Sequence, residues 1–62
     1  MRTEYVEGTV ITETDSAVLL ETDYGELWVP KSIVIDPPDY WDEDEEVEIE
    51  VPTWFAEKEG LV

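Results

Sequence analysis

The sequence contains no cysteine and no histidine. Without cysteine there is no disulfide framework, no thiolate zinc site and no thiol nucleophile. Without histidine the chain lacks the usual general base near neutral pH and the commonest metal ligand. It also lacks an apolar run as long as a secretory signal or a membrane span. We therefore expect a soluble protein, most simply located in the cytoplasm, with no membrane as partner.

Positive charge is scarce as well. Three Lys and Arg residues stand against eighteen Asp and Glu, which gives a formal net charge of −15. Nucleic acids and anionic lipids are polyanions that bind through Lys and Arg, so a direct complex with either is not expected. A basic protein surface is the natural complement of this chain.

The hydrophobic content is too high for a disordered acidic tail. Apolar residues make up 42% of the 62 positions, with three Trp, three Tyr and one Phe. A chain of this length buries only about 60% of the surface that its unfolded form exposes. We expect one small domain over residues 1–62 with an almost wholly anionic surface.

The first half of the chain predicts three strands. Residues 5–12 are rich in β-branched side chains, and Gly8 interrupts their inner face, where a missing side chain marks a bulge or a sharp bend. Residues 17–22 and 26–29 follow as two further strands, joined by a tight turn in which Gly25 suits a left-handed conformation. In the third strand Leu27 and Val29 share one face and Trp28 lies on the other.

The second half predicts a helical turn, a strand and a helix. Pro30 ends the third strand, and residues 31–34 are long enough for one helical turn. The last strand alternates three apolar residues with three glutamates from Glu46 to Val51. Pro52 closes it, Thr53 can cap a helix over residues 54–59, Gly60 ends that helix and Leu61 folds back. The fold class is mainly β: a small, strongly bent antiparallel sheet, or an SH3-like or OB-like barrel of four to five strands, with a short C-terminal helix.

Two segments carry a resemblance to known proteins. One runs from Glu13 to a W-[VI]-P-K-S box at residues 28–32, and the other is the aromatic terminal helix at residues 52–61. The chain resembles a group of small acidic proteins encoded by phages and prophages. The resemblance implies a mobile-element origin and a compact β-rich fold, and it assigns no catalytic residue. Several short acidic phage proteins, anti-CRISPR and anti-restriction proteins among them, inhibit host defence by mimicking nucleic acid.

The acidic residues cluster near the end of the chain. Nine of the eighteen fall between Asp36 and Glu50. Glutamates at every second position of a strand lie about 6.6 Å apart on one face, a spacing similar to that of phosphates along a nucleic-acid strand. Carboxylates accept the same bidentate hydrogen bonds from Arg as phosphates do. The candidate partner-binding residues are Asp39, Tyr40, Trp41, Asp42, Glu43, Asp44, Glu45, Glu46, Glu48 and Glu50.

Two plainer explanations of this charge remain open. The strand and loop could be an ordinary solvated face, or the whole surface could reflect adaptation to a high-salt cytoplasm. The clustering of the acidic residues between Asp36 and Glu50 favours a binding partner over either of these explanations.

The aromatic residues divide into two sets. Trp28 and one of the pair Trp54 and Phe55 are expected to fill the core, because adjacent helical residues point in different directions. Tyr40 and Trp41 lie among carboxylates and suit an Arg-rich partner through cation–π contact. Alternatively, Trp41 folds down as a lid on the open end of the barrel.

Metal, cofactor and enzyme functions find little support. Counted from Asp42, the sixth and twelfth positions of a calcium loop are Val47 and Thr53, where that motif requires Gly and Glu. Ser16 and Ser32 have no histidine to activate them, and so small a chain has little interior for an acid–base pair. We expect no metal, no cofactor and no enzymatic activity.

The preferred function is a non-catalytic inhibitor that occupies a basic nucleic-acid-binding groove of a host defence complex, such as a CRISPR effector, in the host-cell cytoplasm. The alternative is a small SH3-like adaptor or accessory subunit that docks through Trp54, Phe55 and Leu61, its acidity serving solubility. Both a monomer and a dimer are compatible with the sequence, because charge repulsion opposes self-association while an exposed strand edge favours it.

Overall fold

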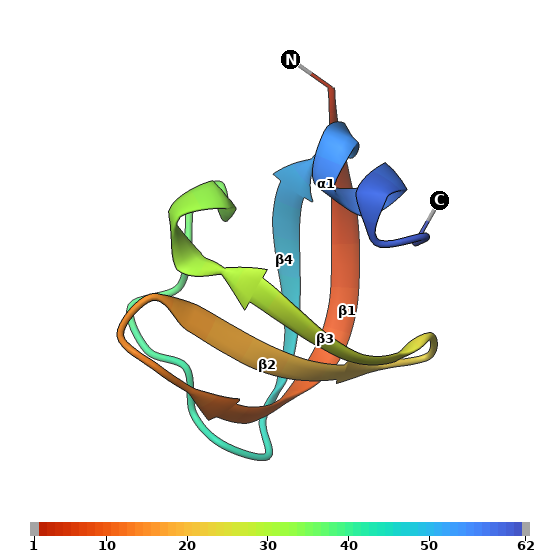
Figure 1. Cartoon of the computed structure of the whole chain (residues 1–62). Helices are drawn as coiled ribbons and strands as arrows, with labels where there is room; N and C mark the ends of the chain where they lie inside the picture. The colour runs from red at the N-terminus through yellow and green to blue at the C-terminus, as the bar shows by residue number, and fades with distance from the viewer. Residues whose placement is uncertain (1, 62) are drawn as a thin grey trace.

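The computed structural model describes residues 2–61, and within them four strands, a 3₁₀ turn and one α-helix follow the order β1, β2, β3, η1, β4, α1 (Figure 1). Their bounds are Thr3–Glu13 for β1, Ala17–Thr22 for β2, Gly25–Pro30 for β3, Lys31–Ile33 for η1, Glu46–Pro52 for β4 and Thr53–Lys58 for α1. Each element was predicted from the sequence, and the strands extend by one or two residues at most beyond the predicted bounds.

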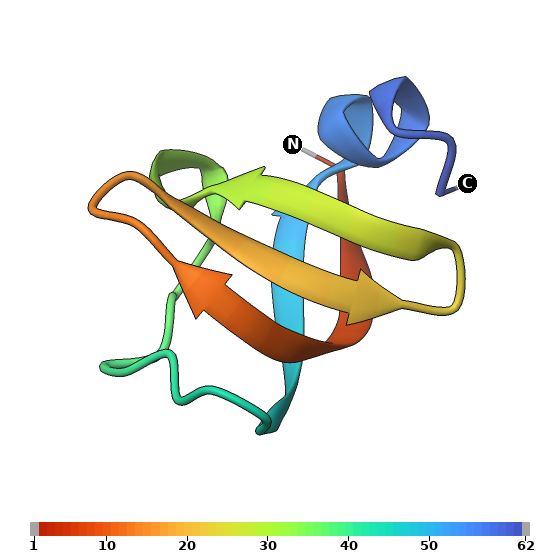
Figure 2. The same cartoon turned by 60° about the horizontal axis from the view of Figure 1, so that its bottom comes forward.

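The strands form one antiparallel sheet in the order β3-β2-β1-β4. The long strand β1 pairs with β4 from Thr3 to Thr9 and with β2 from Thr9 to Glu13. It curves strongly between these two halves, so that the β2–β3 hairpin crosses over the β1–β4 pair (Figures 1 and 2). The strongly bent sheet is therefore confirmed. Among the described strands β3 and β4 remain edges, so the sheet is open and not a closed barrel.

Gly8 lies where two strands approach each other closely. A Cβ at this position would come within 2.9 Å of the Glu21 carbonyl oxygen and 3.2 Å of Leu20 Cβ. The shift of register in β1 falls later, between Val10 and Thr12. Gly8 is thus required by the close approach of β2 to the bend of β1. Of the two alternatives predicted at Gly8, the sharp bend lies beside it, at Thr9, and the bulge lies a few residues further along.

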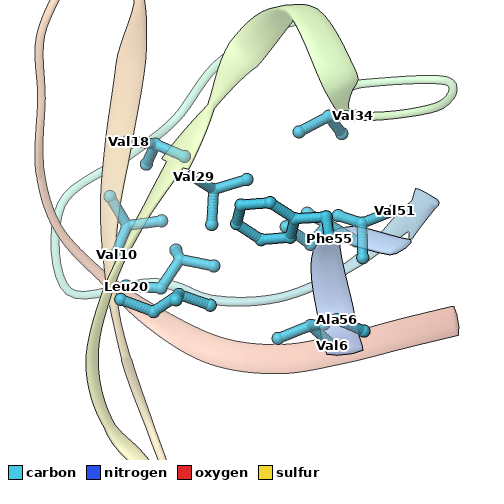
Figure 3. Close-up of a cluster of buried hydrophobic side chains, with 11 residues drawn as sticks. Val6, Val10, Val18, Leu20, Val29, Val34, Val51, Phe55 and Ala56 are labelled. Atoms are coloured by element: carbon cyan, nitrogen blue, oxygen red, sulfur yellow. The ribbon is translucent and has the colours of Figure 1, made fainter. Parts of the chain in front are cut away.

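The core fills the space inside the bent sheet. Apolar residues from all the strands, from Val34 and from the helix form one buried cluster (Figure 3). Its members are Val6, Val10, Val18, Leu20, Leu27, Val29, Val34, Ile49, Val51, Phe55 and Ala56. In Figure 3 the ring of Phe55 reaches from the helix toward Val29, so α1 closes one side of the core.

The ends of α1 differ in how well the sequence predicted them. The N-cap is Pro52, and within the described chain the buried hydroxyl of Thr53 has no hydrogen-bond partner. The prediction that Thr53 caps the helix is therefore wrong, because the helix begins one residue earlier and Thr53 faces the interior. At the other end Gly60 adopts φ +76° and the Leu61 N–H donates to the Ala56 carbonyl at 2.8 Å, so the predicted stop is confirmed.

Two of the aromatic predictions were tested by burial. Phe55 is 4% exposed and Trp54 is 55% exposed, so one member of that pair does fill the core. Trp28 is 50% exposed, and the expectation that it is a core residue is wrong. Leu27 and Val29 occupy the inner positions of β3, which directs Trp28 to the outer face, where it lies opposite Leu19.

No helix within residues 2–61 is long and apolar enough to cross a membrane.

Candidate partner-binding surface

The glutamates of β4 lie on the outer face of the sheet, as their alternation with buried Ile49 and Val51 requires. Glu46 and Glu48 are exposed. Glu50 differs, because it is half-buried and its Oε2 accepts a hydrogen bond of 2.6 Å from the Thr3 hydroxyl. Only the first two of these carboxylates are therefore presented freely to a partner.

The loop before β4 places most of the predicted residues in solvent. The exposed set is Asp39, Tyr40, Asp42, Glu43, Asp44 and Glu45, with Tyr40 76% exposed. Trp41 is half-buried and packs against the core cluster. Of the two interpretations of Trp41, the structure agrees with the lid and not with a side chain free to meet a partner.

The acidic end of this loop is held against β1. The Asp44 N–H donates to the Val10 carbonyl at 2.8 Å, and the Val10 N–H donates to the Glu45 carbonyl at 3.0 Å. Asp44 adopts φ +66°, a left-handed conformation that Asp tolerates better than most residues. The carboxylates of the turn are thus carried on a fixed backbone.

One group of six carboxylates was not predicted as a unit. A shallow groove of about 650 Å³ lies on the sheet at the bend of β1, and among the described residues six acids line it. They are Glu7 of β1, Glu21 of β2, Asp23 of the hairpin turn, Glu26 of β3, and Glu46 and Glu48 of β4. The structure therefore joins two predicted residues to four that sequence reasoning did not select.

Strand pairing sets like charges directly opposite one another in this groove. Glu7 pairs with Glu48 across the β1–β4 ladder, and Glu21 pairs with Glu26 across the hairpin. Thr9 lies between Glu21 of β2 and Glu46 of β4, since it is opposite both of them. Like charges in directly opposed positions destabilise a sheet. The groove is therefore an arrangement that works against the stability of the fold.

Compensating cations lie elsewhere in the described chain. Lys31 Nζ contacts Glu13 Oε1 at 2.7 Å, the one ion pair found within residues 2–61. Neither residue lines the groove. No cluster of three or more acids in the described residues is arranged to hold a metal ion. Within residues 2–61 no Lys or Arg lines the groove, so its carboxylates face solvent without a counter-charge from that part of the chain.

The missed residues could have been found only in part. Glu21 and Glu26 flank the tight turn at Tyr24, so an antiparallel hairpin register alone would have placed them opposite each other. Glu7 meets Glu48 across 41 positions of sequence, and that register depends on the long-range pairing of β1 with β4.

No known protein family, curated protein or solved structure matches this chain.

Proposed function

We propose that this protein is a non-catalytic inhibitor that binds a basic nucleic-acid-binding surface of a host defence complex, such as a CRISPR effector, by mimicking nucleic acid. The observation that carries the proposal is the acidic groove, in which β1, β2, β3 and β4 each contribute at least one glutamate. The preferred site is the groove together with the exposed acids of the neighbouring loop, and the place of action is the host cytoplasm.

The amount of charge supports mimicry. The protein measures 28 Å along its longest axis and carries a net charge of −15. A DNA duplex of that length carries about 16 negative charges, since it has one for each 1.7 Å of its axis. A basic groove shaped to attract duplex DNA would therefore meet a similar quantity of charge on this protein.

The opposed glutamates support binding over mere solubility. A charged surface that served only to keep the protein dissolved could avoid direct Glu–Glu pairs by placing Thr or Lys at one of the two positions. Retaining the pairs Glu7–Glu48 and Glu21–Glu26 costs stability, and interactions with Arg or Lys of a partner would recover it.

Charge reversal within the groove tests the proposal against a matched control. The double variant Glu46→Lys/Glu48→Lys changes the groove, while Glu57→Lys/Glu59→Lys makes the same change of net charge on exposed residues of helix α1 and its C-cap. Glu50 is left unaltered, because its carboxylate accepts the Thr3 hydrogen bond. The assay is competition with labelled target duplex for a panel of purified guide-loaded CRISPR effectors and restriction enzymes.

The wild-type protein and the helix variant are expected to displace the duplex from at least one member of the panel. The groove variant should require roughly tenfold more protein or fail altogether, and displacement should weaken steeply with added salt. Equal loss of activity in both variants would show that net charge alone acts. Binding that is insensitive to salt would instead favour an adaptor, although Phe55 of the suggested adaptor patch is buried and cannot contribute.

A further inference from the structure

A second hollow lies beside the acidic groove, between the first half of β1, the β2–β3 turn and the C-terminal end of the chain. It measures about 330 Å³, enough for one long side chain. Tyr5 and Tyr24 line it together with Ala56 and Leu61. In Figures 1 and 2 the tip of the β2–β3 hairpin and the segment that follows α1 lie on the same side of the molecule, and residues of both line the hollow.

The tyrosines of this hollow are unusually exposed. Tyr5 is 66% exposed and Tyr24 is 73% exposed, so most of the surface of each residue is available to a ligand. Neither ring is needed to fill the core cluster. Carboxylates stand around them, because Glu4, Glu7 and Asp23 line the same hollow.

The hollow and the acidic groove form one continuous surface. Glu7, Thr22 and Asp23 line both of them. A basic segment bound along the groove could therefore place one of its side chains between the hairpin turn and β1 without leaving the acidic surface.

We propose that this hollow receives an arginine side chain of the partner, with its guanidinium against Tyr5 and Tyr24 and its N–H groups donating to the surrounding carboxylates. The proposal deepens the proposed function and rests on it. Guanidinium is planar, stacks on aromatic rings and is more weakly hydrated than ammonium, so arginine suits a site of rings and carboxylates better than lysine does. The three acids disfavour an apolar side chain, and the charge of −15 disfavours a second copy of this chain.

The chain supplies a matched control for the experiment. Trp28 is 50% exposed on the outer face of β3 and lines neither the hollow nor the groove. The double variant Tyr5→Leu/Tyr24→Leu and the control Trp28→Leu leave the net charge unchanged, so long-range attraction is the same in all three proteins. Their affinities for octa-arginine, octa-lysine and an uncharged leucine–serine octapeptide are measured by titration calorimetry at low salt, and circular dichroism verifies that each variant is folded.

The wild-type protein and the Trp28 variant are expected to bind octa-arginine about tenfold more tightly than octa-lysine, and the double variant should lose that preference while still binding both peptides. Equal binding of the two basic peptides by the wild-type protein would overturn the arginine site, as would tighter binding of the uncharged peptide or no binding of any peptide. A similar loss of preference in the Trp28 variant would overturn it too. None of these results depends on whether the groove variant Glu46→Lys/Glu48→Lys still displaces duplex DNA, so the proposed function is judged separately.

Discussion

Thr53 would cap the helix by its local preference, but the packing of the core buries its side chain instead. Its hydroxyl is buried without a hydrogen-bond partner in the described chain, although its backbone N–H donates to the Arg2 carbonyl at 3.0 Å. Leaving a buried hydroxyl unpaired costs about 1–3 kcal/mol. The inward position is imposed by the neighbours of Thr53, since Val51 and Pro52 before it and Phe55 after it are all buried.

Replacing this hydroxyl by a methyl group should stabilise the protein. We expect Thr53→Val to raise the free energy of unfolding by about 1 kcal/mol, because valine has nearly the same shape and no polar group to desolvate. Urea unfolding followed by circular dichroism measures the change. Thr53→Ser keeps the hydroxyl and loses the methyl group, so it should lower stability. A valine variant less stable than the wild type would show that the hydroxyl is hydrogen-bonded in solution.

At the scale of elements, helix α1 has one residue that packs and one that does not. Phe55 is buried in the core, while its neighbour Trp54 lies mostly in solvent and touches it only edge-on, with ring centroids 6.0 Å apart at 86°. A helix of six residues is too short to be stable alone, so its attachment to the sheet depends on Phe55 and Ala56.

The two aromatic residues should therefore respond very differently to truncation. Phe55→Ala should cost about 3–5 kcal/mol, which is most of the roughly 3–9 kcal/mol expected for a domain of this size. Trp54→Ala removes the edge contact and should cost about 1 kcal/mol. Thermal unfolding monitored by circular dichroism distinguishes them. Comparable losses of stability for the two variants would mean that helix α1 does not pack on the sheet through the face that carries Phe55.

At the scale of the whole molecule, stability is governed by self-repulsion. A net charge of −15 on a chain of 62 residues raises the energy of the compact state, and the opposed glutamates concentrate that repulsion in the groove. Salt shortens the range of the repulsion, from about 10 Å at 0.1 M to about 3 Å at 1 M.

Added salt should therefore raise the melting temperature of a protein that is already folded in dilute buffer. We expect an increase of about 5–10 °C between roughly 0.01 M and 1 M sodium chloride, since 1 kcal/mol corresponds to about 4–8 °C in a domain of this size. The Glu57→Lys/Glu59→Lys variant, with a net charge of −15 + 4 = −11, should show a smaller increase. A wild-type chain that is unfolded in dilute buffer and folds only in molar salt would point to the halophilic explanation of its acidity.

The sequence determined the local structure because local structure depends on neighbouring residues. The alternation of apolar residues and glutamates determined which face of β4 is buried. Gly25 and Gly60 determined a turn and a helix end, where their φ values are +106° and +76°. The excess of acidic residues determined that the surface charge is negative. These features need no information from distant parts of the chain.

Tertiary structure alone decided which acids from distant parts of the chain meet. Glu7 lies opposite Glu48 because of the long-range register of β1 with β4. The change of partner of β1 from β4 to β2 brings the hairpin acids to the same groove, and Gly8 permits that crossing by keeping a side chain out of the contact with Glu21. The same crossing brings the hairpin turn with Tyr24 beside Tyr5. Strand register over long separations depends on how the whole core packs, so neither the acidic groove nor the tyrosine-lined hollow could be deduced from the order of residues alone.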